Sequence, residues 1–136
     1  MKTTRREIVL DTSMNILIVD DFSTMRRIIK NLLSELGFTR FEEADDGATA
    51  IPILQGGGID FVVTDWNMPK MTGLDLIKEI RGNDNLKALP ILLVTAEAKK
   101  EQIVEAAKAG VNGYIVKPFT AITLKEKVDR IFDRAA

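Results

Sequence analysis

The chain of 136 residues contains no cysteine and no histidine. Without cysteine there are no disulfides, thiol nucleophiles or zinc–thiolate sites, and without histidine the commonest general base and metal ligand is missing. Serine–histidine hydrolysis and histidine-ligated zinc are therefore excluded. Any reactive or metal-binding site in this chain has to be built from other side chains.

The charge and hydropathy of the chain argue against two further classes of protein. The formal net charge is -1, so there is no basic excess of the kind that favours a nucleic-acid surface. No apolar run approaches the roughly 20 residues that a membrane-spanning helix needs, and the first 13 residues lack the apolar core of a signal peptide. We expect a cytoplasmic protein that binds neither nucleic acid nor membrane.

Short apolar runs alternate with stretches of helical periodicity along the chain. Strands are expected at 15–19, 40–44, 61–64, 90–95 and 113–116, and helices at 24–36, 47–55, 73–81, 99–109 and 121–134. Five consecutive βα units predict a single α/β domain, a doubly wound parallel sheet with right-handed crossovers and helices on both faces. Residues 1–14 precede this pattern and are expected to form a tail, with the domain at 15–136.

Three local signals concern where the helices begin. Ser23 is expected to cap the first predicted helix. Thr72 and Asp75 have the spacing of a capping box before the third helix. Pro52 falls inside the second helix, where its ring and its missing N–H oppose the helical backbone, so a kink or a late start is expected there.

Polar residues follow four of the predicted strands. Asp20 and Asp21 come after the first strand, and the third, fourth and fifth end at Asp65, Thr95 and Lys117. In an open α/β sheet, ligands bind in the crevice outside the carboxyl ends of the strands. We therefore expect these side chains to form one site.

The three aspartates of this set predict a metal ion. Any one of them alone can equally well be explained as a helix cap or an Asx turn. Three carboxylates at one edge, however, repel each other and raise one another's pKa unless a cation lies among them. Mg²⁺ keeps several waters and needs few protein carboxylates when phosphate is a co-ligand, so Mg²⁺ with phosphate is the favoured combination.

A carboxylate is also the best nucleophile that this set offers. Carboxylates form aspartyl-phosphate intermediates in known enzymes, and Asp65 ends a strand that we expect to be central. Lys117 can neutralise charge on a transferring phosphoryl group, and Thr95 adds a hydroxyl from the adjacent strand.

These residues, with the segments DDFSTMRR, DWNMP, VTAEAKKE and GYIVKPFTA, resemble the signature of response-regulator receiver domains, in particular those of chemotaxis. The resemblance extends from about residue 15 to residue 132. It implies a flavodoxin-like sheet with strand order 2-1-3-4-5 and a receiver domain over residues 15–136.

The resemblance also assigns roles at the phosphoryl and metal site. It implies that Asp65 accepts a phosphoryl group from the phosphohistidine of a CheA-like histidine kinase, and that Lys117 binds this group. Asp21, Asp65 and the backbone carbonyl of Asn67 would hold Mg²⁺, with Asp20 reaching the ion partly through water.

Further implications concern the switch and the partners. Thr95 and Tyr114 would be the switch pair, and the Lys117–Pro118 bond is expected to be cis. The protein would be a monomer and would bind the flagellar switch protein FliM. A CheZ-like phosphatase is a further candidate partner. The residues expected to contact FliM are Ala98, Lys99, Lys100, Ile103, Val116, Phe119, Thr120, Thr123 and Lys127.

The same pattern of residues also has to be compared with what other classes of protein require. A flavodoxin-like electron carrier needs a phosphate cradle after the first strand, where two aspartates would repel the flavin phosphate. A phosphatase of the haloacid-dehalogenase type has its nucleophile on the first strand, whereas Asp65 follows the third. A stand-alone receiver that acts as a phosphate sink, or that binds a non-flagellar partner, remains an open alternative.

Overall fold

The computed structural model describes residues 11–133. In this part of the chain five strands alternate with five helices, as the sequence predicts. Their bounds are β1 (Asn15–Val19), α1 (Ser23–Glu35), β2 (Arg40–Ala44), α2 (Gly47–Gln55), β3 (Phe61–Asp65), α3 (Gly73–Arg81), β4 (Ile91–Thr95), α4 (Lys100–Ala109), β5 (Gly113–Val116) and α5 (Ala121–Phe132).

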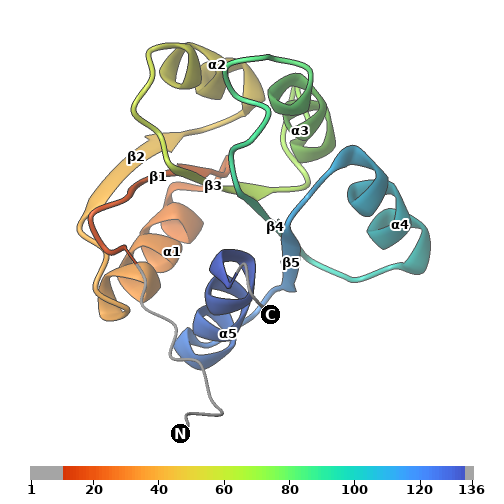
Figure 1. The fold of residues 1–136 in the computed structure, drawn as a ribbon. Coiled ribbons are helices and arrows are strands. Elements are labelled where there is room, and N and C mark those ends of the chain that lie inside the picture. Colours follow the sequence, from red (N-terminus) through yellow and green to blue (C-terminus); the bar gives the residue numbers. More distant parts are fainter. Residues whose placement is uncertain (1–10, 134–136) are drawn as a thin grey trace, which may run out of the picture.

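The five strands form one parallel sheet in the order β2-β1-β3-β4-β5. The helices α1 and α5 cover one face of this sheet, and α2, α3 and α4 cover the other (Figure 1). The flavodoxin-like strand order is therefore confirmed. None of the helices in the described part of the chain combines the length and hydropathy that a membrane span requires.

Side chains of the central strands fill both layers of the core. In β1, Leu17 and Val19 belong to the cluster packed under α2 and α3, whereas Ile16 and Ile18 belong to the cluster shared with α1 and α5. Successive residues of a strand point to opposite faces, so a continuous apolar run is what a parallel strand covered on both sides needs. The strands are thereby held firmly in place.

The registers of the strands bring the polar residues to one edge. Val19 of β1 pairs with Thr64 of β3, so the next residues, Asp20 and Asp65, lie at the same level of the sheet. Thr95 at the end of β4 pairs with Val116 at the end of β5, and Lys117 follows directly. The pairing of the strands therefore brings the predicted site residues together at the carboxyl edge of the sheet.

The capping signals give one confirmed and one wrong prediction. Thr72 and Asp75 form the predicted capping box, with hydrogen bonds of 3.1 and 3.3 Å. Ser23, in contrast, is the first residue of α1 and not its cap, which is Phe22. The reason is that the Asp20 carboxylate accepts the N–H of Phe22 and so sets the turn one residue earlier.

Three further boundaries are resolved by the structure. α2 begins at Gly47, where Asp46 and Thr49 form a capping box, so the late start considered for Pro52 is wrong. α5 ends at Phe132, two residues earlier than expected. Residues 1–10 of the predicted tail lie outside the described residues, and Met14 at its end is buried in the core.

Gly73 allows the start of α3 to lie against the end of β3. Its N–H donates to the carbonyl of Trp66 at 2.9 Å. A Cβ at residue 73 would lie 2.2 Å from the carbonyl oxygen of Asp65 and 3.1 Å from the Cα of Trp66. Both are backbone atoms, so no side-chain rotation can make room for a methyl group.

We predict that Gly73→Ala destabilises the fold by about 1 to 3 kcal/mol, the usual cost of forcing extra volume into a packed site. Gly56→Ala is the matched control, because a Cβ there meets its nearest atom at 3.4 Å. Urea unfolding of the two variants measures the difference. Equal stability of Gly73→Ala and Gly56→Ala would contradict the close approach of α3 to Asp65.

Candidate functional site

Three carboxylates meet at the carboxyl edge of the sheet. Asp20, Asp21 and Asp65 each offer a ligand oxygen, and these oxygens all lie within 4.8 Å of one another. Asp20 has no exposed surface and Asp65 is 6% exposed, whereas Asp21 is exposed. The structure thus brings together the acidic group expected from the sequence, with one member open to solvent.

Lys117 is the cation of this cluster. Its Nζ lies 3.0 Å from Oδ1 of Asp65 and 3.5 Å from Oδ2 of Asp20. The bond between Lys117 and Pro118 is cis, as predicted. One ammonium therefore pairs with two of the three carboxylates, and the cluster carries an excess of negative charge.

Burial dominates the acidity of the site. It raises the pKa of Asp65 above the ordinary value of 3.8, the charges of Asp20 and Asp21 add to the rise, and Lys117 opposes it without cancelling it. Burial likewise raises the pKa of Asp20. For Lys117, burial alone would lower the pKa, but the hydrogen bond and charge of Asp65 together with the charge of Asp20 outweigh burial and raise it.

One buried oxygen shows that this site suits a cation. Oδ2 of Asp20 is buried and accepts no hydrogen bond, and its nearest positive group is Lys117 at 3.5 Å. A buried acceptor without a donor costs free energy, and a hard cation with oxygen ligands removes that cost. The exposed Asp21 leaves an open side for water, and Asn67 lies exposed on the loop that follows β3.

Two groups that the sequence reasoning did not identify hold the turn after β1. The N–H of Phe22 donates to Oδ1 of Asp20 at 2.9 Å. Arg26 donates from Nη1 to the carbonyl oxygen of Asp20 at 2.6 Å and from Nε to Glu43 at 2.9 Å. No sequence motif marks these contacts, because they depend on how α1 is placed against β2.

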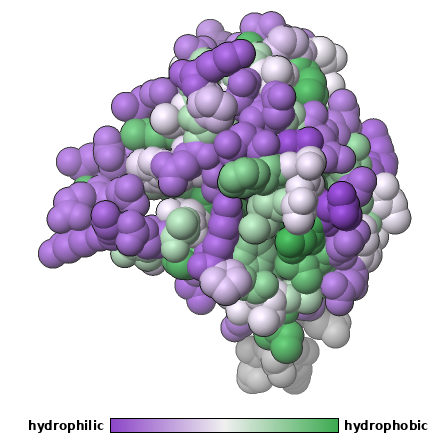
Figure 2. Space-filling view, turned by 180° about the vertical axis from the view of Figure 1, so that it is seen from behind, coloured by the Kyte–Doolittle hydropathy of each residue, from purple (hydrophilic) through white to green (hydrophobic). Residues whose placement is uncertain are grey.

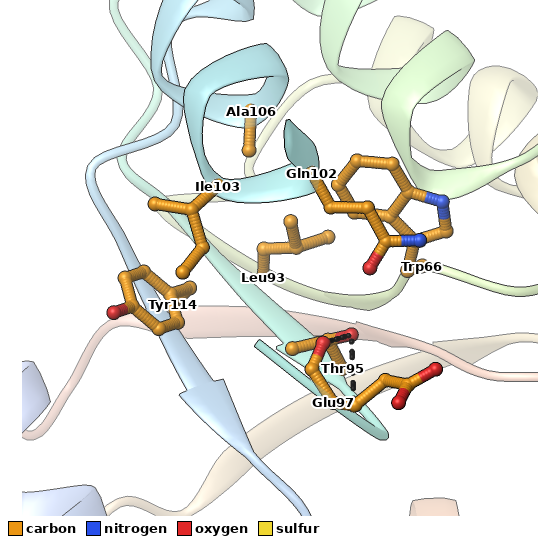
Figure 3. Close-up of a pocket in the computed structure, with 8 residues that line it drawn as sticks. All are labelled: Trp66, Leu93, Thr95, Glu97, Gln102, Ile103, Ala106 and Tyr114. Atoms are coloured by element: carbon orange, nitrogen blue, oxygen red, sulfur yellow. Dashed lines mark hydrogen bonds between the residues drawn. The ribbon is translucent and has the colours of Figure 1, made fainter. Parts of the chain in front are cut away.

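The predicted switch residues Thr95 and Tyr114 line one small cavity between β4, β5 and α4. The hydroxyl of Thr95 donates to the carbonyl of Glu97 at 2.9 Å. Trp66 and Tyr114 lie at opposite ends of the cavity, with Ile103 above the Tyr114 ring (Figure 3). The free volume is about 10 Å³, the lower limit for one water molecule.

Tyr114 also reaches a second depression on the surface. Its hydroxyl points away from the cavity (Figure 3), and the ammonium of Lys127 lies 5.1 Å from the centre of its ring, within the range of a cation–π contact. Lys127 and Tyr114 both line a groove between β5 and α5. The tyrosine ring therefore separates the small cavity from this groove.

The structure divides the residues expected to bind a partner. Lys99 lies outside the groove and pairs with Glu97 at 3.2 Å, Lys100 lies on the outer side of α4, and Ile103 lines the small cavity. The remaining expected residues line the groove together with Tyr114; they are Ala98, Val116, Phe119, Thr120, Thr123 and Lys127.

Hydrophobic side chains also reach the surface. Figure 2 shows apolar residues gathered in the middle of one face, with hydrophilic residues around them. Among the exposed large apolar side chains are Phe22 at 67% and Ile122 at 74%, which lie just before α1 and in the first turn of α5. Both positions follow strand ends and so belong to the same edge as the acidic cluster.

Comparison with known sequences gives the same assignment over nearly the whole chain. Residues 16–129 match the family model of the response regulator receiver domain. The chain is 69% identical over 128 residues to the chemotaxis protein CheY-3 of Vibrio cholerae, covering 94% of this chain and 98% of that protein. It is also 69% identical over 121 residues to the chemotaxis protein CheY of Pseudomonas aeruginosa, covering 89% and 98%.

Solved structures agree with the sequence matches. The chemotaxis protein CheY4 of Vibrio cholerae has a TM-score of 0.81 at 34% identity, covering 88% of this chain and 98% of that one. The receiver domain of a sensor histidine kinase from Pseudomonas aeruginosa, with a magnesium ion coordinated in its active site cleft, has a TM-score of 0.78 at 29% identity, covering 87% and 96%. The chain belongs to the response regulator receiver family, among the chemotaxis regulators of the CheY type.

Proposed function

We propose that Asp65 takes a phosphoryl group from the phosphohistidine of a CheA-like kinase, with Mg²⁺ as cofactor, and that the phosphorylated protein binds the flagellar switch protein FliM. One observation carries this proposal. The Lys117 ammonium lies 3.0 Å from the Asp65 carboxylate, within a cluster whose three carboxylates offer oxygens within 4.8 Å of one another.

The chemistry follows from this arrangement. An oxygen of the Asp65 carboxylate attacks phosphorus, the bond between phosphorus and the histidine nitrogen breaks, and an acyl phosphate forms. Lys117 stabilises the negative charge on the phosphoryl oxygens. Mg²⁺, held by Asp21, Asp65 and the carbonyl of Asn67 and reached by Asp20 partly through water, would supply further neutralisation of that charge.

The return reaction needs only water. Hydrolysis of the acyl phosphate releases inorganic phosphate and restores the Asp65 carboxylate. The chain thus catalyses its own phosphorylation and dephosphorylation, and a CheZ-like phosphatase would accelerate the second reaction. We place this monomer in the cytoplasm, with a histidine kinase and the flagellar switch as its partners.

The switch is proposed to act through two adjacent spaces. Phosphoryl oxygens at Asp65 would compete with the Glu97 carbonyl for the hydroxyl of Thr95. The ring of Tyr114 could then move further into the space beside Thr95. Because Tyr114 lines both the cavity and the partner groove, its movement would change the shape of that groove.

We predict that Asp65→Asn abolishes phosphorylation by acetyl phosphate and by phosphorylated kinase, because an amide cannot form the acyl phosphate. Asp45→Asn is the control, since Asp45 follows β2 at the same edge but lies outside the cluster. Mass spectrometry with phosphosite mapping gives the readout. A stable acyl phosphate at residue 65 of the variant would rule out the assignment.

We predict that Asp20→Asn stabilises the magnesium-free protein at pH 7. Burial raises the pKa of Asp20 in the folded state, so the folded protein favours the protonated carboxyl. This contribution to stability is fully present below pH 3.8 and is lost as pH rises through the raised pKa. The amide removes that loss and can still accept the Phe22 N–H. We therefore expect the variant to unfold at a higher temperature than the wild type at pH 7, and the two to converge toward pH 4.

Thermal unfolding between pH 4 and pH 8 measures this effect. Asp84→Asn is the control, because its carboxylate is 96% exposed. Mg²⁺ should stabilise the wild type more at pH 7 than at pH 4, since protonated carboxyls bind it poorly. Parallel stability profiles of the wild type and the Asp20→Asn variant would contradict a free-energy cost of burying the Asp20 carboxylate.

We predict that FliM peptide binds about 5- to 150-fold more tightly in the presence of beryllofluoride and Mg²⁺, the usual range of allosteric coupling. Thr95→Ala should lose most of this gain while keeping the basal affinity. Fluorescence anisotropy of a labelled peptide measures both values. Equal affinity with and without beryllofluoride would favour the phosphate-sink function or a non-flagellar partner.

A further inference from the structure

We propose that Arg26 is a positioning residue for the metal site: its guanidinium fixes the peptide that links Asp20 to Asp21. This inference rests on the proposed Mg²⁺ site at these two aspartates. It assigns a role to a residue of α1 that contributes no ligand atom and lies outside the acidic cluster.

The contacts of Arg26 join three elements. Its Nη1 donates to the carbonyl oxygen of Asp20 at 2.6 Å, and its Nε donates to Oε1 of Glu43 on β2 at 2.9 Å. Its backbone N–H donates to the carbonyl of Phe22 at 3.1 Å. The side chain is 17% exposed. One planar group therefore ties the first turn of α1 to the end of β1 and to β2.

The peptide that Arg26 holds is the one between the two predicted metal ligands. The N–H of Asp20 is bound by the carbonyl of Ala44 at 3.1 Å, and its Oδ1 accepts the N–H of Phe22. The bond from Arg26 to the Asp20 carbonyl fixes the next backbone group in the chain. A charged donor makes this bond stronger than a neutral one, so rotation of the peptide before Asp21 is opposed.

Asp21 depends on this support more than its neighbours do. Asp20 and Asp65 are buried and are held by the sheet and by Lys117, whereas the side chain of Asp21 is exposed. The direction of an exposed side chain is set mainly by its backbone. Loss of the Arg26 contact should therefore affect the position of Asp21 before it affects the sheet.

The charge of Arg26 has the opposite effect on the metal. A cation near an acidic site repels Mg²⁺, so removal of that charge alone should tighten metal binding. This repulsion is weak, because Glu43 pairs with Arg26, and the hydrogen bond from Arg26 lowers the pKa of Glu43. Lys30 reaches the second oxygen of Glu43 at 3.5 Å. Positioning and electrostatics thus predict changes of opposite sign.

The deciding experiment is a Mg²⁺ titration followed by the fluorescence of Trp66, next to Asp65. Arg26→Met should bind Mg²⁺ about 10-fold more weakly than wild type, at the lower end of the range for residues that orient metal ligands. Arg27→Met is the matched control, because Arg27 is the next residue of the same helix and is exposed. It should bind Mg²⁺ as well as wild type or slightly better.

Arg26→Lys separates geometry from charge, because it keeps the positive charge but loses the two-pronged guanidinium. Its Mg²⁺ affinity should lie between those of wild type and Arg26→Met, and it decides the test if Arg26→Met does not fold by circular dichroism. If Arg26→Met folds and binds Mg²⁺ with wild-type affinity, the inference is overturned. If Arg26→Met does not fold, wild-type affinity in Arg26→Lys overturns it. A wild type that shows no Mg²⁺ binding refutes the proposed metal site instead.

Discussion

Burial of two carboxylates within a cluster of three is the constraint around which this structure is arranged. The sheet register places Asp20 beside Asp65, and Lys117 supplies one positive charge to a cluster of three acids. Burial raises the pKa of two of these acids, so the folded protein holds its site at a cost in free energy. The strands can bear that cost because their apolar side chains fill both layers of the core.

The same cost gives the site its proposed use. A cluster with excess negative charge and a buried oxygen that lacks a donor has much to gain from a cation. Because Asp21 is open to solvent, the ion can stay partly hydrated and can accept phosphoryl oxygens as ligands. A site whose charges and hydrogen bonds were fully compensated by its own side chains would gain less free energy from binding a cation or a phosphoryl group. Incomplete compensation in the resting protein is therefore what suits it to a reversible phosphoryl signal.

The sequence was sufficient to predict the architecture and the gathering of the polar residues at one edge, for a physical reason. Apolar runs covered on both sides can only be interior strands, and parallel strands end at a common edge, so Asp65, Thr95 and Lys117 had to converge. The contacts of Arg26 and Glu97 could not be predicted, because they join backbone carbonyls to groups whose placement depends on tertiary packing. Ser23 illustrates the same limit, since a carboxylate from the preceding turn determined where the helix starts.

The path from the acidic site to the groove between β5 and α5 crosses a single pair of strands. Thr95 pairs with Val116, and Tyr114 lies two residues earlier on the same strand, so the proposed switch residues are held by one stretch of ladder. The backbone between them is fixed, which leaves the Thr95 hydroxyl and the Tyr114 ring as the parts that can move. A cavity of about 10 Å³ gives the ring little free space, so its inward movement requires α4 or the loop after β4 to yield. The proposed response at the groove would therefore depend on the packing of α4 as well as on the phosphoryl group.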